Sequence, residues 1–110
     1  MDKNEIVLRE SENDGQSVFL YYDELIGLYM AFGQSVYYVT MVTDPFVSYS
    51  VQLDIPVGLL RREHILALRQ SMEKVEHIQK RFYWFRLKAP VGKNGYTKWV
   101  EKIHKKHEGI

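Results

Sequence analysis

Residues 47–56 have the sequence VSYSVQLDIP, and this stretch gives the clearest secondary-structure pattern in the chain. Apolar side chains from Val47 to Ile55 alternate strictly with polar ones. A period of two is typical of a β-strand with one buried face and one solvated face. Because proline cannot donate to a strand ladder, we expect this strand to end at Pro56.

The segments before this strand also favour β-structure. Residues 17–22 (SVFLYY) and 35–43 (SVYYVTMVT) are rich in β-branched and aromatic residues, and residues 5–10 alternate over a short strand. We expect residues 5–10 and 17–22 to form a hairpin, because Asn and Gly in residues 12–16 tolerate the positive φ of a tight turn.

Two interpretations remain open for residues 25–32. After Asp23 and Glu24, which could cap a helix, apolar residues recur at helical spacing up to Phe32, and Gly33 could end the helix. Aromatic residues and glycines are unusual inside a helix, however, so a strand is the alternative. The choice changes the number of strands in the sheet.

The apolar period changes from two to between three and four after about Leu59. Ile65, Leu68, Met72, Val75 and Phe82 follow helical spacing, which predicts one long helix reaching towards residue 87. Residues 89–95 (APVGKNG) form a loop in this interpretation. A last helix follows, and its apolar face is expected to hold Tyr96, Trp99, Val100 and Ile103.

Strands that precede helices predict an α+β fold. We expect an antiparallel sheet of about four strands in two hairpins, with the long helix and the C-terminal helix packed on one face. The length of 110 residues suits one domain, 1–110, of which residues 1–56 are mainly β with one short helix and residues 57–110 are helical.

The composition indicates a protein of a reducing compartment. Cysteine is absent, which excludes disulfides and cysteine nucleophiles. The first five residues are polar and acidic, unlike a signal peptide, and the longest apolar stretch, residues 25–42, is too diluted for a membrane span. We therefore expect a cytoplasmic protein without a membrane-spanning segment.

The net charge of +1 conceals an uneven distribution of ionisable residues. Residues 1–60 contain two basic and nine acidic residues, whereas residues 61–110 contain thirteen basic and five acidic ones. Such asymmetry indicates either a basic surface for an anionic partner or complementary contact between halves or subunits.

No local motif indicates catalysis or cofactor binding. His104 and His107 lie three residues apart, but a metal site needs three or four ligands and the neighbouring lysines repel a cation. The chain has no G-x-S-x-G elbow, and residues 92–95 (GKNG) are too short for a phosphate-binding loop. The sequence thus predicts no catalytic, cofactor-binding or metal-binding residue and favours a protein that is not an enzyme, although scattered residues can still assemble an active site.

Residues 80–88 (KRFYWFRLK) hold four consecutive aromatic residues between cations. Aromatic side chains bury much area at little entropic cost and are enriched at interfaces. We expect a non-catalytic interaction or regulatory module that associates with itself or with another protein. Its candidate interface consists of Phe82, Tyr83, Trp84 and Phe85, of which at least one ring should be exposed.

Nucleic-acid binding is the alternative function. Rings that stack on bases, set among cations that follow phosphates, are typical of proteins that bind single strands. An accessory protein of this kind would use the basic, aromatic C-terminal half of the chain. The candidate contacts are Arg81, Arg86, Lys88, Lys98, Lys102 and Lys105.

Overall fold

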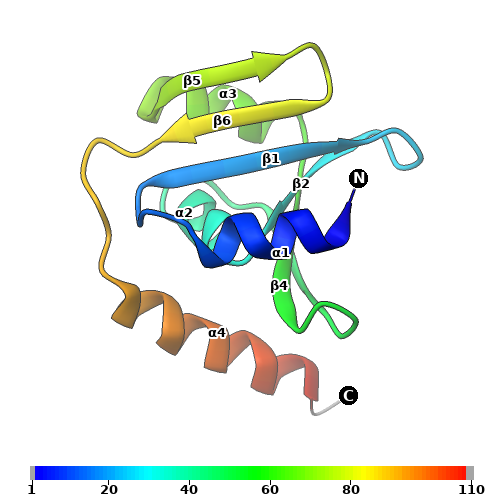
Figure 1. Cartoon of the computed structure of the whole chain (residues 1–110), viewed down its shortest axis with the longest axis vertical. Coiled ribbons are helices and arrows are strands. Elements are labelled where there is room, and N and C mark those ends of the chain that lie inside the picture. Colours follow the sequence, from blue (N-terminus) through cyan, green and yellow to red (C-terminus); the bar gives the residue numbers. More distant parts are fainter. Residues whose placement is uncertain (1, 109–110) are drawn as a thin grey trace.

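The computed structural model describes residues 2–108, and in this part of the chain helices and β-hairpins alternate (Figure 1). Each of the three hairpins is followed by a helix, and one further helix precedes them all. The elements are α1 (Lys3–Ser11), β1 (Ser17–Asp23), β2 (Leu28–Phe32), α2 (Gln34–Thr40), β3 (Phe46–Ser50), β4 (Ile55–Leu60), α3 (Arg62–Ser71), β5 (Glu73–Ile78), β6 (Phe82–Arg86) and α4 (Lys93–Glu108).

The six strands form one sheet in the order β3-β4-β2-β1-β6-β5, and every neighbouring pair is antiparallel. The first hairpin therefore occupies the centre, and the second and third hairpins flank it. The α+β class and the antiparallel sheet are confirmed. The strand count is not, because the sheet has six strands rather than about four.

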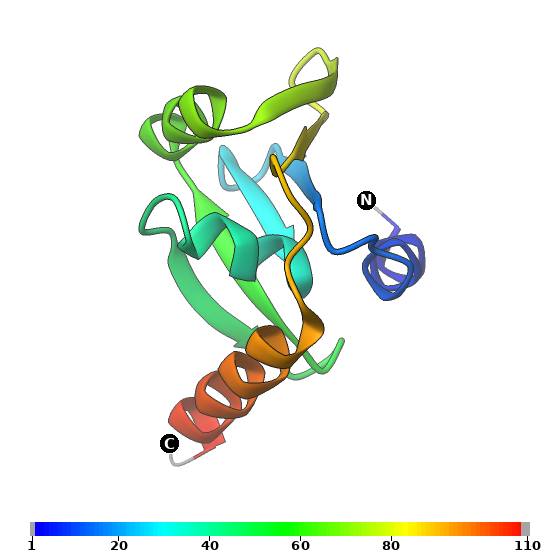
Figure 2. The same cartoon turned by 90° about the vertical axis from the view of Figure 1, so that its left-hand side faces the viewer.

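The two faces of the sheet are covered unequally. Figure 2 shows α2, α3 and α4 on one face, which we call the three-helix face, and α1 on the other. Side chains alternate between the two faces along β1 and β6. Those of Val18, Leu20 and Phe85 lie on the three-helix face, where they are fully buried. The main core lies there and also includes Ala31, Val36, Tyr38, Val39, Leu60, Ile65, Leu68, Met72 and Tyr83.

The strand predicted for residues 5–10 is wrong, because this segment lies in α1. The side chain of Asp2 accepts hydrogen bonds from the backbone N–H groups of Asn4 and Glu5 and caps the helix. Ile6 and Glu10, four residues apart, are the buried positions of α1, so a helical period governs the burial.

The strand predicted for residues 35–43 is also wrong, because residues 34–40 form α2. Gly33 precedes the helix with a φ of 55°, a conformation that favours glycine. Val36 and Val39 are completely buried one turn apart. Burial against the sheet therefore outweighs the β-propensity of this segment.

Residues 25–32 form a turn and a strand, which settles the open choice in favour of the strand. The side chain of Asp23 accepts a hydrogen bond from the N–H of Leu25, and Gly27 has a φ of 69°. Asp23 thus stabilises the turn between β1 and β2 rather than capping a helix.

The continuous strand predicted for residues 47–55 is a hairpin. β3 ends at Ser50 and β4 begins at Ile55, and Asp54 has a φ of 56° in the turn between them. The Tyr49 hydroxyl donates a hydrogen bond to the Asp54 carboxylate across the turn. Pro56 lies near the start of β4 and does not end the strand, which continues to Leu60.

The long helix predicted to run from about residue 59 to residue 87 is wrong. α3 ends at Ser71, Met72 has extended backbone angles, and β5 and β6 follow as a hairpin. Residues 57–110 are therefore not purely helical. The C-terminal helix is confirmed, and Tyr96, Trp99, Val100 and Ile103 are its half-buried residues. No helix within residues 2–108 combines the length and the apolar character that crossing a membrane requires.

Candidate functional site

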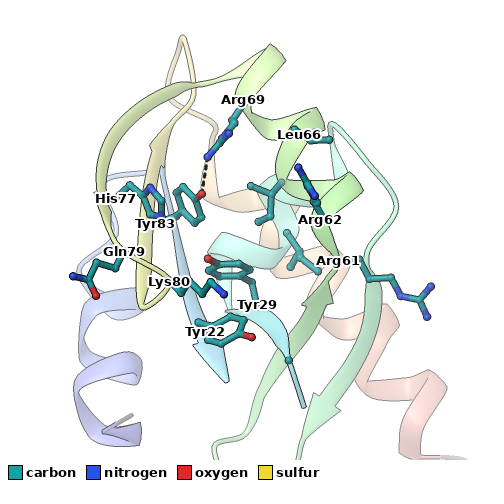
Figure 3. Close-up of a pocket in the computed structure, with 13 residues that line it drawn as sticks. Tyr22, Tyr29, Arg61, Arg62, Leu66, Arg69, His77, Gln79, Lys80 and Tyr83 are labelled. Carbon is teal, nitrogen blue, oxygen red and sulfur yellow. Dashed lines mark hydrogen bonds between the residues drawn. The ribbon is translucent and has the colours of Figure 1, made fainter. Parts of the chain in front are cut away.

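A cleft of about 490 Å³ opens between α3 and the β5–β6 hairpin (Figure 3). Its size lies in the range of small-molecule sites, which is roughly 300–1,000 Å³. We call it the arginine–tyrosine cleft and define it by its charged and aromatic lining, which consists of Arg61, Arg62, Arg69, Lys80, Tyr22, Tyr29, Tyr83 and His77.

The cations of the cleft come from two elements. Arg62, Leu66 and Arg69 lie one and two helical turns apart, so they share one side of α3. Lys80 comes from the turn between β5 and β6. Figure 3 shows Arg69 and Lys80 directed toward the rings, whereas Arg61 points away from them. The described residues that line the cleft include no carboxylate.

The rings of the cleft form a continuous ladder. Tyr22 and Tyr29 face each other across β1 and β2 with ring centroids 5.1 Å apart. The Tyr29 and Tyr83 centroids are 5.2 Å apart. His77 lies opposite Tyr83 in the β5–β6 ladder and stacks on it at 3.9 Å with an interplanar angle of 8°. Such cross-strand pairs stabilise a sheet and hold each ring in one orientation.

A hydrogen bond joins the helix to the hairpin. The Arg69 guanidinium donates to the Tyr83 hydroxyl at 2.7 Å and lies 5.6 Å from the centroid of that ring. Burial raises the pKa of the Tyr29 phenol, with smaller contributions from Tyr83 and Tyr22. Tyr29 therefore stays protonated near neutral pH and can donate a hydrogen bond to an anion.

Two neighbouring cavities contain carboxylates. One neighbour shares Arg61 with the cleft and also contains Asp44 and Glu63. Another shares Tyr22 and contains Asp23 and Glu24. The cleft is thus a cationic region flanked on two sides by cavities that contain acidic residues.

Strand alternation divides the predicted aromatic run between the two faces. Tyr83 and Phe85 are buried on the three-helix face, where Tyr83 also lines the cleft. Phe82 and Trp84 are half-buried on the opposite face. Phe19 lies beside both of them, with centroids 6.1 Å from Phe82 and 5.7 Å from Trp84.

The predicted basic contacts lie on separate elements. Arg81 is exposed at the start of β6, Lys88 is exposed after it, and half-buried Arg86 forms an ion pair with Asp14 at 3.3 Å. The outer face of α4 carries Lys98, Lys102 and Lys105, all exposed. Figure 1 shows α4 well apart from β6, so these six cations do not form one cluster.

The cleft itself was not predicted from the sequence. A short helix carrying Arg62, Leu66 and Arg69 on one side was a usable signal, because that spacing aligns two cations. The aromatic run at residues 82–85 was a second signal, because alternation in a strand would have placed Tyr83 inward. Both signals were hidden by the assumption of one long helix.

Among the side chains that the structure describes, in residues 2–92 and 94–106, no group of three or more His, Asp or Glu residues is arranged to hold a metal ion. Comparisons of the chain with protein-family models, with curated proteins and with solved structures found no match. The geometry of the cleft is therefore the basis for a functional proposal.

Proposed function

We propose that this protein is a non-catalytic interaction module that recognises an anionic group in the arginine–tyrosine cleft. The observation that carries the proposal is the lining, in which the cationic side chains of Arg62, Arg69 and Lys80 occur without a carboxylate among the described lining residues. Unpaired like charges repel each other, and an anion relieves this repulsion. Guanidinium groups also match phosphate and carboxylate geometry through paired N–H donors.

The cleft is suited to binding more than to catalysis. Its described lining contains no serine, threonine or carboxylate that could pair with His77 as a nucleophile or base. The Tyr29 phenol, whose pKa burial raises further above its ordinary value of 10, is protonated at neutral pH and can donate a hydrogen bond. The hydrogen bond from Arg69 to Tyr83 pre-organises one cation, which reduces the entropy lost on binding.

The test is a titration with inorganic pyrophosphate at low salt, followed by the backbone NMR signals of the whole chain. We expect saturable shifts confined to the elements that line the cleft, which are α3, the β5–β6 hairpin and the β1–β2 hairpin. The double variant Arg62→Gln/Arg69→Gln should bind at least tenfold more weakly. Lys98→Gln/Lys102→Gln removes the same charge from the exposed face of α4 and is the matched control.

Either of two results would contradict the proposal. Pyrophosphate could cause no saturable shifts in the cleft, or the α4 control could weaken binding as much as the cleft variant does. The second result would mean that overall charge, and not the cleft, attracts the anion. Thermal unfolding of each variant shows whether it remains folded.

We also propose self-association, for which the α1-covered face of the sheet offers a surface. Phe82 and Trp84 are half-buried there, and Phe46 at the edge strand is 67% exposed. Light scattering over a range of concentrations should show a dimer that Trp84→Ala or Phe46→Ser weakens. Leu25→Ser, at a turn residue that is 97% exposed, is the control and should leave the dimer intact.

Nucleic-acid binding remains the alternative proposal, supported by the row of exposed lysines on α4. A short oligonucleotide should then bind with an affinity that falls steeply with salt, and Lys98/Lys102/Lys105→Glu should abolish binding. A loss of oligonucleotide binding in the cleft variant alone would instead assign the contact to the cleft.

A further inference from the structure

We infer that the anionic ligand of the arginine–tyrosine cleft is a free nucleoside phosphate. The inference rests on the proposed anion-binding function and names the class of ligand. Three features of the cleft support it: the number of cations, the aromatic and apolar surface beside them, and the charge balance of the neighbouring cavities.

The number of cations indicates a ligand with several negative charges. Arg62 and Arg69 reach the cleft from α3, and Lys80 reaches it from the hairpin (Figure 3). A single carboxylate would leave most of this charge uncompensated. A diphosphate or triphosphate supplies several oxygens for paired guanidinium donors as well as for the point charge of a lysine.

The surface beside the cations suits a planar ring. Tyr22 and Tyr29 are half-buried, and their rings form the end of the ladder away from His77. Leu66, which is 46% exposed, adds apolar surface to the same cleft. A nucleobase can stack on tyrosine and cover such a leucine, and the tyrosine hydroxyls can bond to polar atoms of the base or sugar.

The charge balance of the neighbouring cavities limits the length of the ligand. The cavity beyond Arg61 contains Asp44 and Glu63 together with Lys106, and the cavity beyond Tyr22 contains Asp23 and Glu24 together with Arg81. Because the acidic residues at least balance the basic ones in both cavities, the phosphates of a longer strand would find no net positive charge there. A nucleotide within a single strand has the same chemistry, but this arrangement favours the free nucleotide.

The test compares four probes by calorimetry on the whole chain: ADP, inorganic pyrophosphate, adenosine and a short single-stranded oligonucleotide. ADP should bind at least tenfold more tightly than pyrophosphate, which has the same two phosphorus atoms but no ring. Leu66→Ser should reduce ADP affinity several-fold and leave pyrophosphate affinity unchanged. Leu8→Ser, at a position of α1 that is 57% exposed, is the matched control and should change neither affinity.

The outcomes separate this inference from the proposed function. Equal affinity for ADP and pyrophosphate would refute the inference that the ligand is a nucleotide, but it would still support an anion-binding site. Tighter binding of the oligonucleotide than of ADP would overturn the free nucleotide in favour of a single strand. Tighter binding of adenosine than of ADP would overturn the role of the phosphates, and absence of binding by every probe would overturn the inference together with the proposed function.

Discussion

Replacement of Glu10 by Gln should remove a large part of the pH dependence of folding stability. Glu10 is 5% exposed near the end of α1, where its carboxyl group reaches the first residues of α2. It accepts a hydrogen bond from the Ser35 N–H at 3.0 Å and forms another with the Ser35 hydroxyl. The Asn13 side chain donates a weaker one at 3.5 Å.

Burial dominates the ionisation of this group. It raises the pKa of Glu10 from 4.5 to about 7, against the lowering effects of Ser35, Asn13 and the nearby Arg9. The folded state therefore holds a proton that the unfolded state releases above pH 4.5. The resulting stability is fully present below pH 4.5 and is lost as the pH rises through about 7.

The magnitude follows from this difference in pKa. Each pKa unit corresponds to about 1.4 kcal/mol, so the shift of Glu10 makes the folded protein about 2.5 kcal/mol less stable at pH 8 than at pH 5. Gln is a neutral isostere of the protonated acid, and its amide oxygen can accept the hydrogen bond that the Ser35 N–H donates to Glu10. Glu10→Gln should therefore lack this contribution.

The assay is urea unfolding at several pH values between 5 and 8, followed by tryptophan fluorescence. Only the difference in slope between the wild type and Glu10→Gln is interpreted, because this difference separates the contribution of Glu10 from that of every other ionisable group. Glu12→Gln, at an exposed position after the same helix, is the control and should retain the slope of the wild type. Identical slopes for the wild type and Glu10→Gln would refute the reasoning, because they would show that the hydrogen bonds keep Glu10 ionised despite its burial.

Three further predictions concern stability and are checked by the same urea titration. A Cβ at Gly58 would lie 2.3 Å from Cγ2 of Val36, so Gly58→Ala should destabilise the protein by about 1–3 kcal/mol, whereas Gly92→Ala, which meets no atom within 4 Å, should change stability little. Asp2→Ala removes the cap of α1 and should destabilise by about 1 kcal/mol. Phe85→Ala empties a fully buried site and should destabilise by roughly 3–5 kcal/mol.

The α+β class, strand β1 and helix α4 were predictable because local signals and burial agree there. Residues 17–22 have β-propensity and lie at the centre of the sheet. The apolar residues of α4 repeat at helical spacing, and those same residues are half-buried against the rest of the fold. Gly15 also adopts the positive φ expected of the turn predicted for residues 12–16.

Segments with conflicting local signals could not be assigned from the sequence. Residues 34–40 have the composition of a strand. They form a helix, however, in which Val36 and Val39 are buried against the sheet. The alternation of apolar and polar residues in 47–55 continues through a hairpin turn. A period of two alone therefore does not show where the chain reverses direction. In both cases tertiary contacts outweigh the local pattern.

The cleft depends on the segment where the sequence was most misleading. In a continuous helix, Arg69 and Tyr83 would lie about 21 Å apart along the axis, because fourteen residues separate them. Since α3 ends at Ser71 and β5 and β6 fold back, their side chains instead meet at 2.7 Å. The hairpin that breaks the helix therefore also creates the cationic site. A helix-favouring change in β5 would weaken both the sheet edge and anion binding, whereas an equally exposed change on α4 would affect neither.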